Sequence, residues 1–412
     1  MPTADHRLKA DGARVLADLN TLRTFGAYKT GVHRPTFSEP HLRSLHWLAE
    51  KLPQADLAAE IDGIGNVLGT SAKSGPKLLV GSHLESQNFA GWLDGPLGVV
   101  YALEAARVIN PDPDINGAVE VAAWCDEEGH FGHFLGSRSY VGDVTDHDID
   151  TARDRTDNRT MRAALQAAGL ADRRRATVEP GRHIGYLEAH IEQGRTLEGS
   201  GLGIGVVTSI VGIWQYQIVF TGEQNHAGTT QMKDRRDAGL ALAKLCVAID
   251  DRFPASSGPR TVWTTGRMTL DPGAPSIIPG RSEMLFQIRD DNPEVVEHLE
   301  ALLREIATEI AAASRCDVDV KRLRTGKPAM MDERFQHAIE GAASIWAAGK
   351  SVRMPSGAGH DAQVLATIMP AGMLFVPSIG GISHHWTENT DDADIVRGAE
   401  VFVEACLRLL AN

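Results

Sequence analysis

Cysteine is scarce in this chain. Only four of its 412 residues are cysteines, at positions 125, 246, 316 and 406, and no two of them form a Cys-x-x-Cys pair. Such widely separated cysteines favour reduced thiols in a cytoplasmic protein. Cys125 lies beside an acidic motif, but its neighbours in the expected strand are apolar. We therefore interpret it as a small core residue rather than a nucleophile.

Long apolar runs and an excess of basic charge are also absent. No segment approaches the ~20 apolar residues that a membrane-spanning helix requires, and residues 1–7 lack the apolar core of a signal peptide. The net charge is −13, and the most basic stretch, residues 173–175, is expected to be a solvated loop or helix end. We therefore expect neither nucleic acid nor a membrane among the partners.

What is present is the composition of an ordinary globular protein. Apolar residues make up 42% of the chain and charged residues 23%. A length of 412 residues exceeds the usual size of one hydrophobic core, which suggests two domains. The sequence shows no internal repeat and no low-complexity segment.

The first 200 residues alternate between helical and strand patterns. Ser38 precedes one helical pattern and is its expected N-cap. This alternation predicts an α/β domain with a central mixed sheet, and such sheets bind ligands at the carboxyl ends of their strands. The expected helices are residues 8–25, 39–51 and 98–109, and the expected strands are residues 67–70, 78–81 and 119–124.

The pattern changes near residue 209. Strand and helix signals then follow the order β-α-β-β-α-β, which is that of a ferredoxin-like unit. Because a histidine motif at residues 380–384 follows this unit, we expect residues 209–326 to be inserted in a catalytic domain made of residues 1–208 and 327–412. The helix expected over residues 236–250 carries an apolar stripe of Leu240, Leu242, Leu245, Val247 and Ile249.

Carboxylates and imidazoles occur where the apolar strand patterns end. These are the ligand types that a divalent hydrolytic metal centre needs. Because strand ends meet at one edge of a sheet, residue 83 and the acidic pair at 127–128 are expected to share one site. The acidic and imidazole residues of this set are His83, Asp94, Glu127, Glu128, His190 and His384.

The adjacent residues Glu127 and Glu128 suggest two different roles. A regular strand would point them to opposite faces, but a turn at Gly129 can bring both towards one cavity. One can ligate a metal, while the other acts as general base on a water whose pKa the metal lowers from ~15.7 towards 7. The alternative is a solvated acidic turn. For Asp94, the alternative to a metal ligand is a helix N-cap.

Eight short motifs follow one another along the chain. They are GSHLE (81–85), DGPLGV (94–99), DEEG (126–129), LGSR (135–138), EAHIEQG (188–194), NHAGTT (225–230), SGAGHDAQ (356–363) and GGISH (380–384). In this order they resemble the hydantoinase/carbamoylase family of dinuclear metal amidohydrolases, which is related to aminoacylases and metal carboxypeptidases. The resemblance covers about residues 20–410.

The resemblance implies a centre with two divalent metal ions. Asp94 would bridge the ions, with His83 and His190 at one of them and Glu128 and His384 at the other. Mixed imidazole and carboxylate ligation accommodates zinc, manganese, cobalt or nickel.

The resemblance also implies the catalytic residues. Glu127 would be the general base. His385 directly follows His384, and spacing alone does not separate them, so the family pattern selects His384 as the ligand. His226 would stabilise the oxyanion of the tetrahedral intermediate. Its alternative is a loop residue in a β-turn.

Further residues would recognise the substrate. Arg289 ends an expected strand and would clamp a substrate carboxylate with its planar guanidinium. Two positions depart from the family pattern. Glu85 replaces an aspartate and would hold the free nitrogen of the neighbouring imidazole, and Ser276 replaces an asparagine. Phe89 and Trp92 either line the pocket or pack in the core. The other implied contacts are Gln193, Asn225, Gly380 and Gly381.

The implied activity is metal-dependent hydrolysis of a linear ureido or amide C–N bond in a small carboxylate substrate. An N-carbamoyl-L-amino acid is the expected substrate, giving the amino acid, carbon dioxide and ammonia. Allantoate, ureidoglycolate, an N-acyl amino acid and an aryl amide are the alternative substrates. A metal-bearing scaffold without activity is a third reading, which the free base expected at residue 127 argues against. The inserted domain would act as a lid and build a homodimer.

Overall fold

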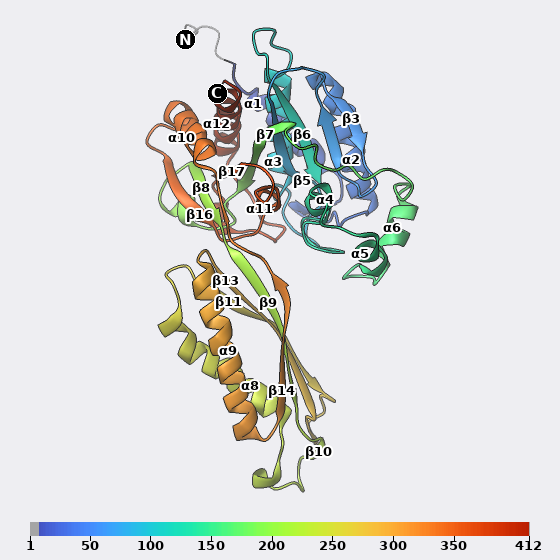
Figure 1. The fold of residues 1–412 in the computed structure, drawn as a ribbon, viewed down its shortest axis with the longest axis vertical. Coiled ribbons are helices and arrows are strands. Elements are labelled where there is room, and N and C mark those ends of the chain that lie inside the picture. The colour runs from blue at the N-terminus through green and yellow to red at the C-terminus, as the bar shows by residue number, and fades with distance from the viewer. Residues whose placement is uncertain (1–7, 412) are drawn as a thin grey trace. The chain divides into compact units, whose positions relative to one another are not determined.

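The computed structural model describes residues 8–411 and divides the chain into two compact units. Of the described residues, unit 1 contains residues 8–208 and 330–411, and unit 2 contains residues 209–329 (Figure 1). No helix within residues 8–411 is both long enough and apolar enough to cross a membrane.

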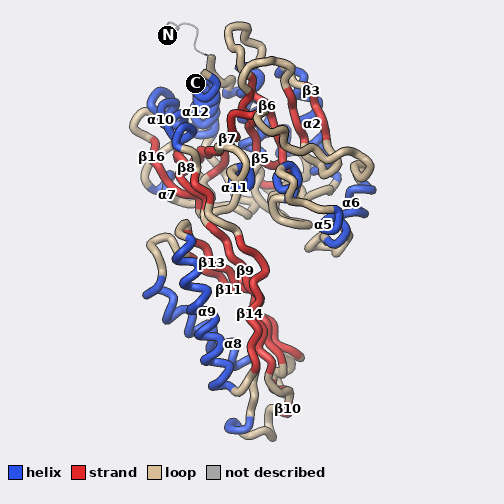
Figure 2. Tube along the Cα trace, viewed as in Figure 1, coloured by secondary structure: helices blue, strands red, loops and turns tan. Residues whose placement is uncertain are grey.

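Unit 1 contains a nine-stranded sheet in which β15-β8-β17-β7-β5-β6-β4-β3 are neighbours and β16 pairs with β8 (Figure 2). The predicted α/β fold with a central mixed sheet is confirmed, because parallel and antiparallel pairs both occur in it. The strands are β3 Ala58–Ile61, β4 Val67–Thr70, β5 Lys77–His83, β6 Ala118–Trp124, β7 His183–Ile191, β8 Ile204–Ile210, β15 Ala329–Met330, β16 Ser351–Ser356 and β17 Ala371–Val376.

Four neighbouring strands of this sheet, β17, β7, β5 and β6, run parallel to one another. Every residue of β6 and β17 is buried, as is typical of strands covered on both faces. Since the four strands are parallel, their carboxyl ends meet at one edge of the sheet. That edge carries the candidate site.

The helices of unit 1 pack on the sheet and on one another. Helix α3 packs on β5, β6 and β7, and both α1 and α12 pack on α3. The elements are α1 Gly12–Arg23, α2 Glu39–Lys51, η2 Leu52–Ala55, α3 Pro96–Ile109, α4 Leu135–Tyr140, α5 Asp146–Thr151, α6 Met161–Ala167, α7 Thr196–Gly199, α10 Glu333–Trp346, α11 Asp361–Leu365, η5 Ile379–Gly381 and α12 Asp392–Leu410, with the short strands β1 Ala27–Tyr28 and β2 Gly31–Val32.

Several local predictions in unit 1 are confirmed. Ser38 caps α2, because its side chain accepts a hydrogen bond from the His41 N–H. Cys125 is fully buried in a small apolar cluster. Of the two aromatic residues near Asp94, Trp92 packs in the main core, whereas Phe89 is 49% exposed.

Unit 2 is a four-stranded antiparallel sheet with two long helices. Its elements follow the order β9-α8-β11-β13-α9-β14, and the sheet order is β11-β13-β9-β14. Two short strands, β10 and β12, form a separate pair. The bounds are β9 Gly212–Thr221, β10 Asn225–His226, η3 Met232–Asp234, α8 Ala238–Arg252, η4 Phe253–Ser256, β11 Val262–Asp271, β12 Ile277–Ile278, β13 Arg281–Asp290, α9 Pro293–Ser314 and β14 Asp317–Thr325.

The apolar stripe predicted for α8 is only partly correct. Leu242, Leu245 and Ile249 are buried in the core of unit 2, as their spacing of three and four residues requires. Leu240 and Val247 are 45% and 62% exposed. Each lies two residues from a buried leucine, about 200° around the helix axis, and so faces away from the sheet.

Candidate metal centre

The parallel strands of unit 1 place most of the candidate ligands at one edge of the sheet. His83 is the last residue of β5, and His190 is the next-to-last residue of β7. Glu127 and Glu128 follow β6, and His384 follows β17 and η5. Each side chain therefore comes from the carboxyl end of one of four neighbouring strands, where α/β sheets bind ligands.

Asp94 lies in the turn that precedes α3. Gly95, and not Asp94, is the N-cap residue of that helix, so the helix-cap alternative for Asp94 is not found. Gly95 has a φ of +84°, and a Cβ atom there would lie 2.4 Å from Nδ1 of His83. Only glycine lets the turn approach the imidazole this closely.

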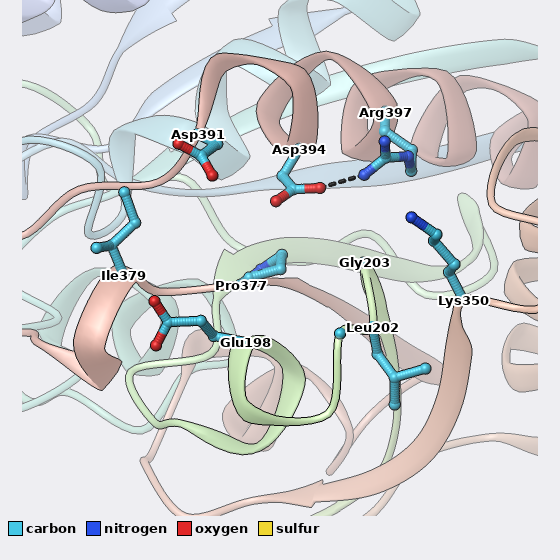
Figure 3. Close-up of a pocket in the computed structure, with 10 residues that line it drawn as sticks. Glu198, Leu202, Gly203, Lys350, Pro377, Ile379, Asp391, Asp394 and Arg397 are labelled. Carbon is cyan, nitrogen blue, oxygen red and sulfur yellow. Dashed lines mark hydrogen bonds and ion pairs between the residues drawn. The ribbon is translucent and has the colours of Figure 1, made fainter.

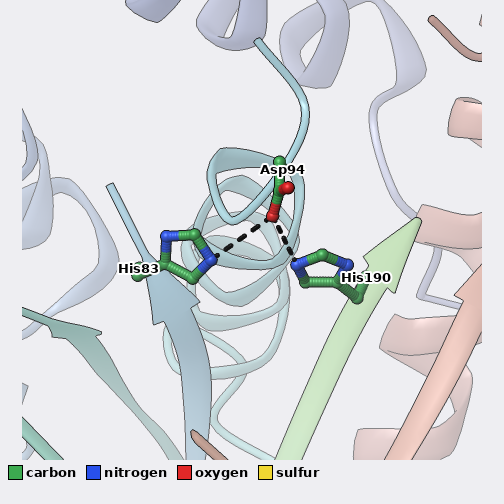
Figure 4. Close-up of side chains that lie close together, drawn as sticks. All are labelled: His83, Asp94 and His190. Carbon is green, nitrogen blue, oxygen red and sulfur yellow. Dashed lines mark ion pairs between the residues drawn. The ribbon is translucent and has the colours of Figure 1, made fainter. Parts of the chain in front are cut away.

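The Asp94 carboxylate joins two groups of ligand-type side chains. Its Oδ1 lies 3.1 Å from Nε2 of His190 and 3.5 Å from Nε2 of His83 (Figure 4). Its Oδ2 lies 3.3 Å from Nε2 of His384, which is 3.6 Å from Oε2 of Glu128. Within each group the possible donor atoms lie within 4.8 Å of one another. One oxygen of Asp94 thus faces each group, as a bridging carboxylate requires.

The chemistry of this donor set fits two divalent cations. His83, Asp94, Glu128 and His190 are at most 4% exposed. Although burial opposes ionisation, hydrogen bonds to three imidazoles hold the pKa of Asp94 well below its usual range. Burial and repulsion by Asp94 raise the pKa of Glu128. Carboxylates crowded away from water repel each other, and bound cations would remove that repulsion.

Glu127 lies beside both groups without belonging to either. Its Oε2 is 3.8 Å from Nε2 of His83, and the residue is 8% exposed. Burial raises the pKa of Glu127 well above its ordinary value. Repulsion by Glu128 and Asp361 adds to this effect, against the attraction of His83. A carboxylate of raised basicity beside a metal centre is suited to accept a proton from water.

Asp126 builds the turn that carries Glu127, and sequence reasoning missed it. Its backbone adopts a φ of +60°. Its carboxylate accepts hydrogen bonds from the main-chain N–H groups of residues 130, 131 and 132, at 2.8, 2.9 and 2.8 Å. The Thr36 hydroxyl donates a fourth, at 2.7 Å. The aspartate of the DEEG motif therefore holds the turn, which the motif alone does not reveal.

Glu85 differs from its expected role. Nδ1 of His83 lies 3.2 Å from the main-chain oxygen of Glu85, and 3.7 Å from the side-chain Oε1. That Oε1 accepts the N–H of Glu127 at 2.6 Å. The backbone of Glu85 thus holds the imidazole, while its carboxylate holds the turn after β6.

Glu388 is a second residue that sequence reasoning missed. It is buried, and its Oε1 accepts the main-chain N–H of Asp94 at 3.1 Å. Its Oε2 accepts the hydroxyl of Ser383 at 3.0 Å. Gln193, expected to contact substrate, donates to Oδ2 of Asp94 at 3.0 Å and to Ser383 at 3.1 Å. These bonds tie the bridging carboxylate to the loop that carries His384.

The loop after β17 separates His384 from His385. His384 faces Asp94 and Glu128, whereas Nδ1 of His385 pairs with the hydroxyl of Thr387 at 2.7 Å. The expected substrate contacts Gly380 and Gly381 precede His384 and have φ angles of +65° and +67°.

The structure also brings three of the predicted residues of unit 2 together. Asn225 and His226 form β10, and the N–H of Ala227 donates to the main-chain oxygen of Ser276 at 2.9 Å. Arg289 is not part of this group, because it lies at the other end of β13. Along that strand, Arg281 and Arg289 are about 26 Å apart at 3.3 Å per residue.

A separate pocket of about 260 Å³ lies in unit 1 where α7 and the start of α12 meet (Figure 3). Lys350 and Arg397 lie at one side of it, and Arg397 forms an ion pair with Asp394. None of the ten residues that line it is a candidate metal ligand.

Known proteins resemble this chain over most of its length. The model of peptidase family M20/M25/M40 matches residues 80–408. N-carbamoyl-L-amino-acid amidohydrolase of Paenarthrobacter aurescens is 34% identical over 402 residues, covering 95% of this chain and 97% of the relative. Allantoate amidohydrolase of Bacillus subtilis is 30% identical over 396 residues, covering 92% and 93%. The crystal structure of an amidase of the hydantoinase/carbamoylase family from Burkholderia phymatum is 44% identical, with a TM-score of 0.87 and 99% of both chains covered.

Proposed function

Because the chain belongs to peptidase family M20/M25/M40 and to its hydantoinase/carbamoylase amidases, we propose that it hydrolyses the ureido C–N bond of an N-carbamoyl-L-amino acid. It is an amidohydrolase by this membership. The carbamoyl substrate is supported by the relative from Paenarthrobacter aurescens. The observation that carries the proposal is the Asp94 carboxylate between two donor groups, with Glu127 beside them.

Two divalent ions, of zinc, manganese, cobalt or nickel, would be held at the centre. His83, Asp94 and His190 would hold one, and Asp94, Glu128 and His384 the other. When bound, such ions polarise a carbonyl group and lower the pKa of water towards neutrality.

Glu127 handles the proton of the reaction. Its Oε2 accepts a proton from the attacking water as the water oxygen adds to the ureido carbon. The same carboxylic acid then gives that proton to the leaving nitrogen as the C–N bond breaks. The amino acid leaves, and the carbamic acid that remains decomposes to carbon dioxide and ammonia.

Unit 2 would supply residues that bind the substrate and its oxyanion. Arg289, at the end of β13, would hold the substrate carboxylate. In His226, Nδ1 accepts the N–H groups of Gly228 and Thr229 at 3.0 and 3.2 Å. The ring proton of His226 is therefore on Nε2, which is left to donate to an oxyanion. The further proposed substrate contacts are Asn225 and Ser276 of unit 2 and Gln193, Gly380 and Gly381 of unit 1.

We also propose that unit 2 is a ferredoxin-like lid that builds a homodimer. Arg289 lies about 26 Å from the end of β13 that is next to the β10–β12 pair, so Arg289 and His226 do not reach the same small substrate. If Arg289 serves its own chain, His226 serves the site of a second copy. The edge strand β11 and the neighbouring α8 carry apolar side chains open to such a partner, namely Leu240, Val247, Val262, Met268 and Leu270.

Replacement of the base tests the mechanism. We expect Glu127→Gln to lower kcat by about 10²- to 10⁴-fold, because the amide accepts no proton, while the metal content measured by elemental mass spectrometry stays unchanged. Turnover at the wild-type rate by a metal-loaded Glu127→Gln variant would remove Glu127 from the mechanism.

The substrate is tested with a panel of carbamoyl-L-amino acids, carbamoyl-β-alanine, allantoate and N-acyl amino acids. Allantoate is the second candidate substrate, because the Bacillus subtilis allantoate amidohydrolase is 30% identical over nearly the whole chain. The highest kcat/KM is expected for a carbamoyl-L-amino acid. A higher value for allantoate would favour the second candidate, and no turnover with any supplied metal would favour a scaffold.

A further inference from the structure

A buried cluster of three ionisable side chains contacts the turn that carries Glu127. It consists of Arg34, His41 and Glu85, all of them fully buried. Oε2 of Glu85 lies 3.6 Å from Nε2 of His41. Buried charges cost free energy unless they are paired and hydrogen-bonded, so such a cluster calls for an explanation.

The carboxylate of Glu85 spans from this cluster to the general base. Its Oε1 accepts the main-chain N–H of Glu127 at 2.6 Å and lies 3.4 Å from that of Glu128. The bond to Glu127 is short, as is typical of an amide that donates to a carboxylate. A single oxygen atom thus faces the backbone of both the proposed base and a proposed metal ligand.

Arg34 holds the segment that contains Glu85. Its Nε donates to the main-chain oxygen of Leu84 at 2.7 Å. The main-chain N–H of Arg34 donates to Oγ of Ser86 at 3.1 Å, and the main-chain oxygen of Arg34 accepts the N–H of Ser86 at 3.0 Å. Glu85 is therefore held from the residues on both sides of it.

His41 lies beside the far oxygen of Glu85, at a distance of 3.6 Å. Nδ1 of His41 accepts the N–H of Phe37 at 3.0 Å, so the ring proton lies on Nε2, which faces Glu85. Burial lowers the pKa of His41 to about 4, so the ring is neutral near pH 7. The Nε2–H group of His41 thus lies near Oε2 of Glu85, and the turn that carries Glu127 lies at Oε1.

We propose that Glu85 is a positioning residue that sets the place of the Glu127 carboxylate through the main-chain amides of the turn, a task that requires the length of glutamate. The proposal rests on the proposed role of Glu127. The competing role is to hold the imidazole of His83, the task expected from the family, in which an aspartate stands at this position. Holding the turn requires the length of the glutamate side chain, whereas holding the imidazole of His83 requires its negative charge.

Two variants separate the two roles. Glu85→Asp keeps the charge but is one methylene shorter, and Glu85→Gln keeps the length and one acceptor oxygen. We expect Glu85→Asp to lower kcat about 10- to 100-fold, because a displacement near 1 Å can cost about 10²-fold in rate. KM and metal content should change little. Glu85→Gln should retain clearly more of kcat than Glu85→Asp.

Glu120→Gln is the matched control. Glu120 is also a buried carboxylate that accepts a main-chain N–H. It lies near the start of β6, away from the edge of the sheet that carries the candidate site. Its replacement should lower the melting temperature and leave kcat unchanged. If kcat falls in Glu85→Asp without an equal fall in Glu120→Gln, the loss reflects a displaced Glu127 carboxylate and not a lower stability of the fold.

Hydrogen–deuterium exchange gives a readout that needs no substrate. The amides of Glu127 and Glu128 should exchange slowly in the wild type and in Glu85→Gln, and faster in Glu85→Asp. Wild-type exchange and kcat in Glu85→Asp would overturn the proposal. Loss of metal in Glu85→Gln but not in Glu85→Asp would also overturn it, in favour of the role at His83. If the wild type hydrolyses no member of the substrate panel, the proposed function fails, while the exchange rates still decide whether Glu85 holds the turn.

Discussion

At the residue scale, the candidate site depends on which atom of a side chain faces which neighbour. The two oxygens of Asp94 face different imidazoles, and the two oxygens of Glu388 hold the turn before α3 and the loop that carries His384. Such assignments separate residues that the sequence leaves equivalent. His384 and His385 are the clearest case, because only His384 faces the carboxylates.

The two adjacent histidines give a prediction with an internal control. If the proposed two metal ions are bound per chain, His384→Ala should lose about one of them, because it removes an imidazole from the group with Asp94 and Glu128. His385→Ala should keep both ions, since its ring pairs with Thr387. The measurement is metal content after dialysis. Equal loss in both variants would contradict the assignment.

At the element scale, the two ends of the parallel strands carry different clusters of polar side chains. The carboxyl ends of β5, β6, β7 and β17 lead to the candidate ligands. The opposite ends carry a different cluster of ionisable side chains around the buried Glu120. There Glu120 of β6 accepts hydrogen bonds from Arg182 at 2.8 and 3.0 Å, and its Oε2 lies 2.9 Å from Nε2 of His183.

The Glu120 cluster predicts a pH dependence of stability. Burial opposes ionisation, but hydrogen bonds with His183 and Arg182 outweigh it and lower the pKa of Glu120 from 4.5 to about 2. Because the folded state lowers this pKa, ionised Glu120 stabilises the fold above pH 4.5, and that contribution is lost as the pH falls towards 2.

Thermal unfolding measured between pH 7 and pH 3 tests this. The melting temperature of the wild type should fall below pH 4.5, and Glu120→Gln should start lower at pH 7 and lose less over the same range. Parallel curves for the two proteins would show that Glu120 makes no such contribution.

At the scale of the whole molecule, unit 2 carries two proposed substrate contacts near opposite ends of β13. His226 lies in β10, beyond the end of β13 at Arg281, and Arg289 lies near the other end of that strand. A rigid unit presents only one of these ends to a small substrate. The proposal that His226 acts in the site of a second copy follows from this separation.

Complementation between two inactive variants tests this proposal. His226→Ala and Glu127→Gln homodimers should both have low kcat with normal metal content. Heterodimers, isolated with two affinity tags, should regain about half of the wild-type activity, because one of the two sites then combines an intact Glu127 with an intact His226. Heterodimers as inactive as either parent would place His226 in the site of its own chain.

Much of the candidate centre could be predicted, because its ligands lie in short motifs after apolar segments and those motifs resemble the ones of a known family. We expected five ligands to share one site, and the structure places them in two groups joined by Asp94. The five are His83, Asp94, Glu128, His190 and His384. The contacts of the supporting residues could not be predicted in this way. Glu85 bonds to a residue 42 positions away, and Glu388 bonds to one 294 positions away. No local pattern encodes such contacts.

The sequence by itself determined the kinds of chemistry available to this protein, because imidazoles and carboxylates after apolar strands are local features of the chain. It also determined the mixed α/β architecture through the alternation of helical and strand patterns. Only the tertiary structure decided which oxygen of Asp94 faces which imidazole, that the carboxylate of Glu85 accepts the N–H of Glu127, and that His226 and Arg289 lie near opposite ends of β13. These facts depend on distances between segments that are far apart in the chain, and packing alone sets those distances.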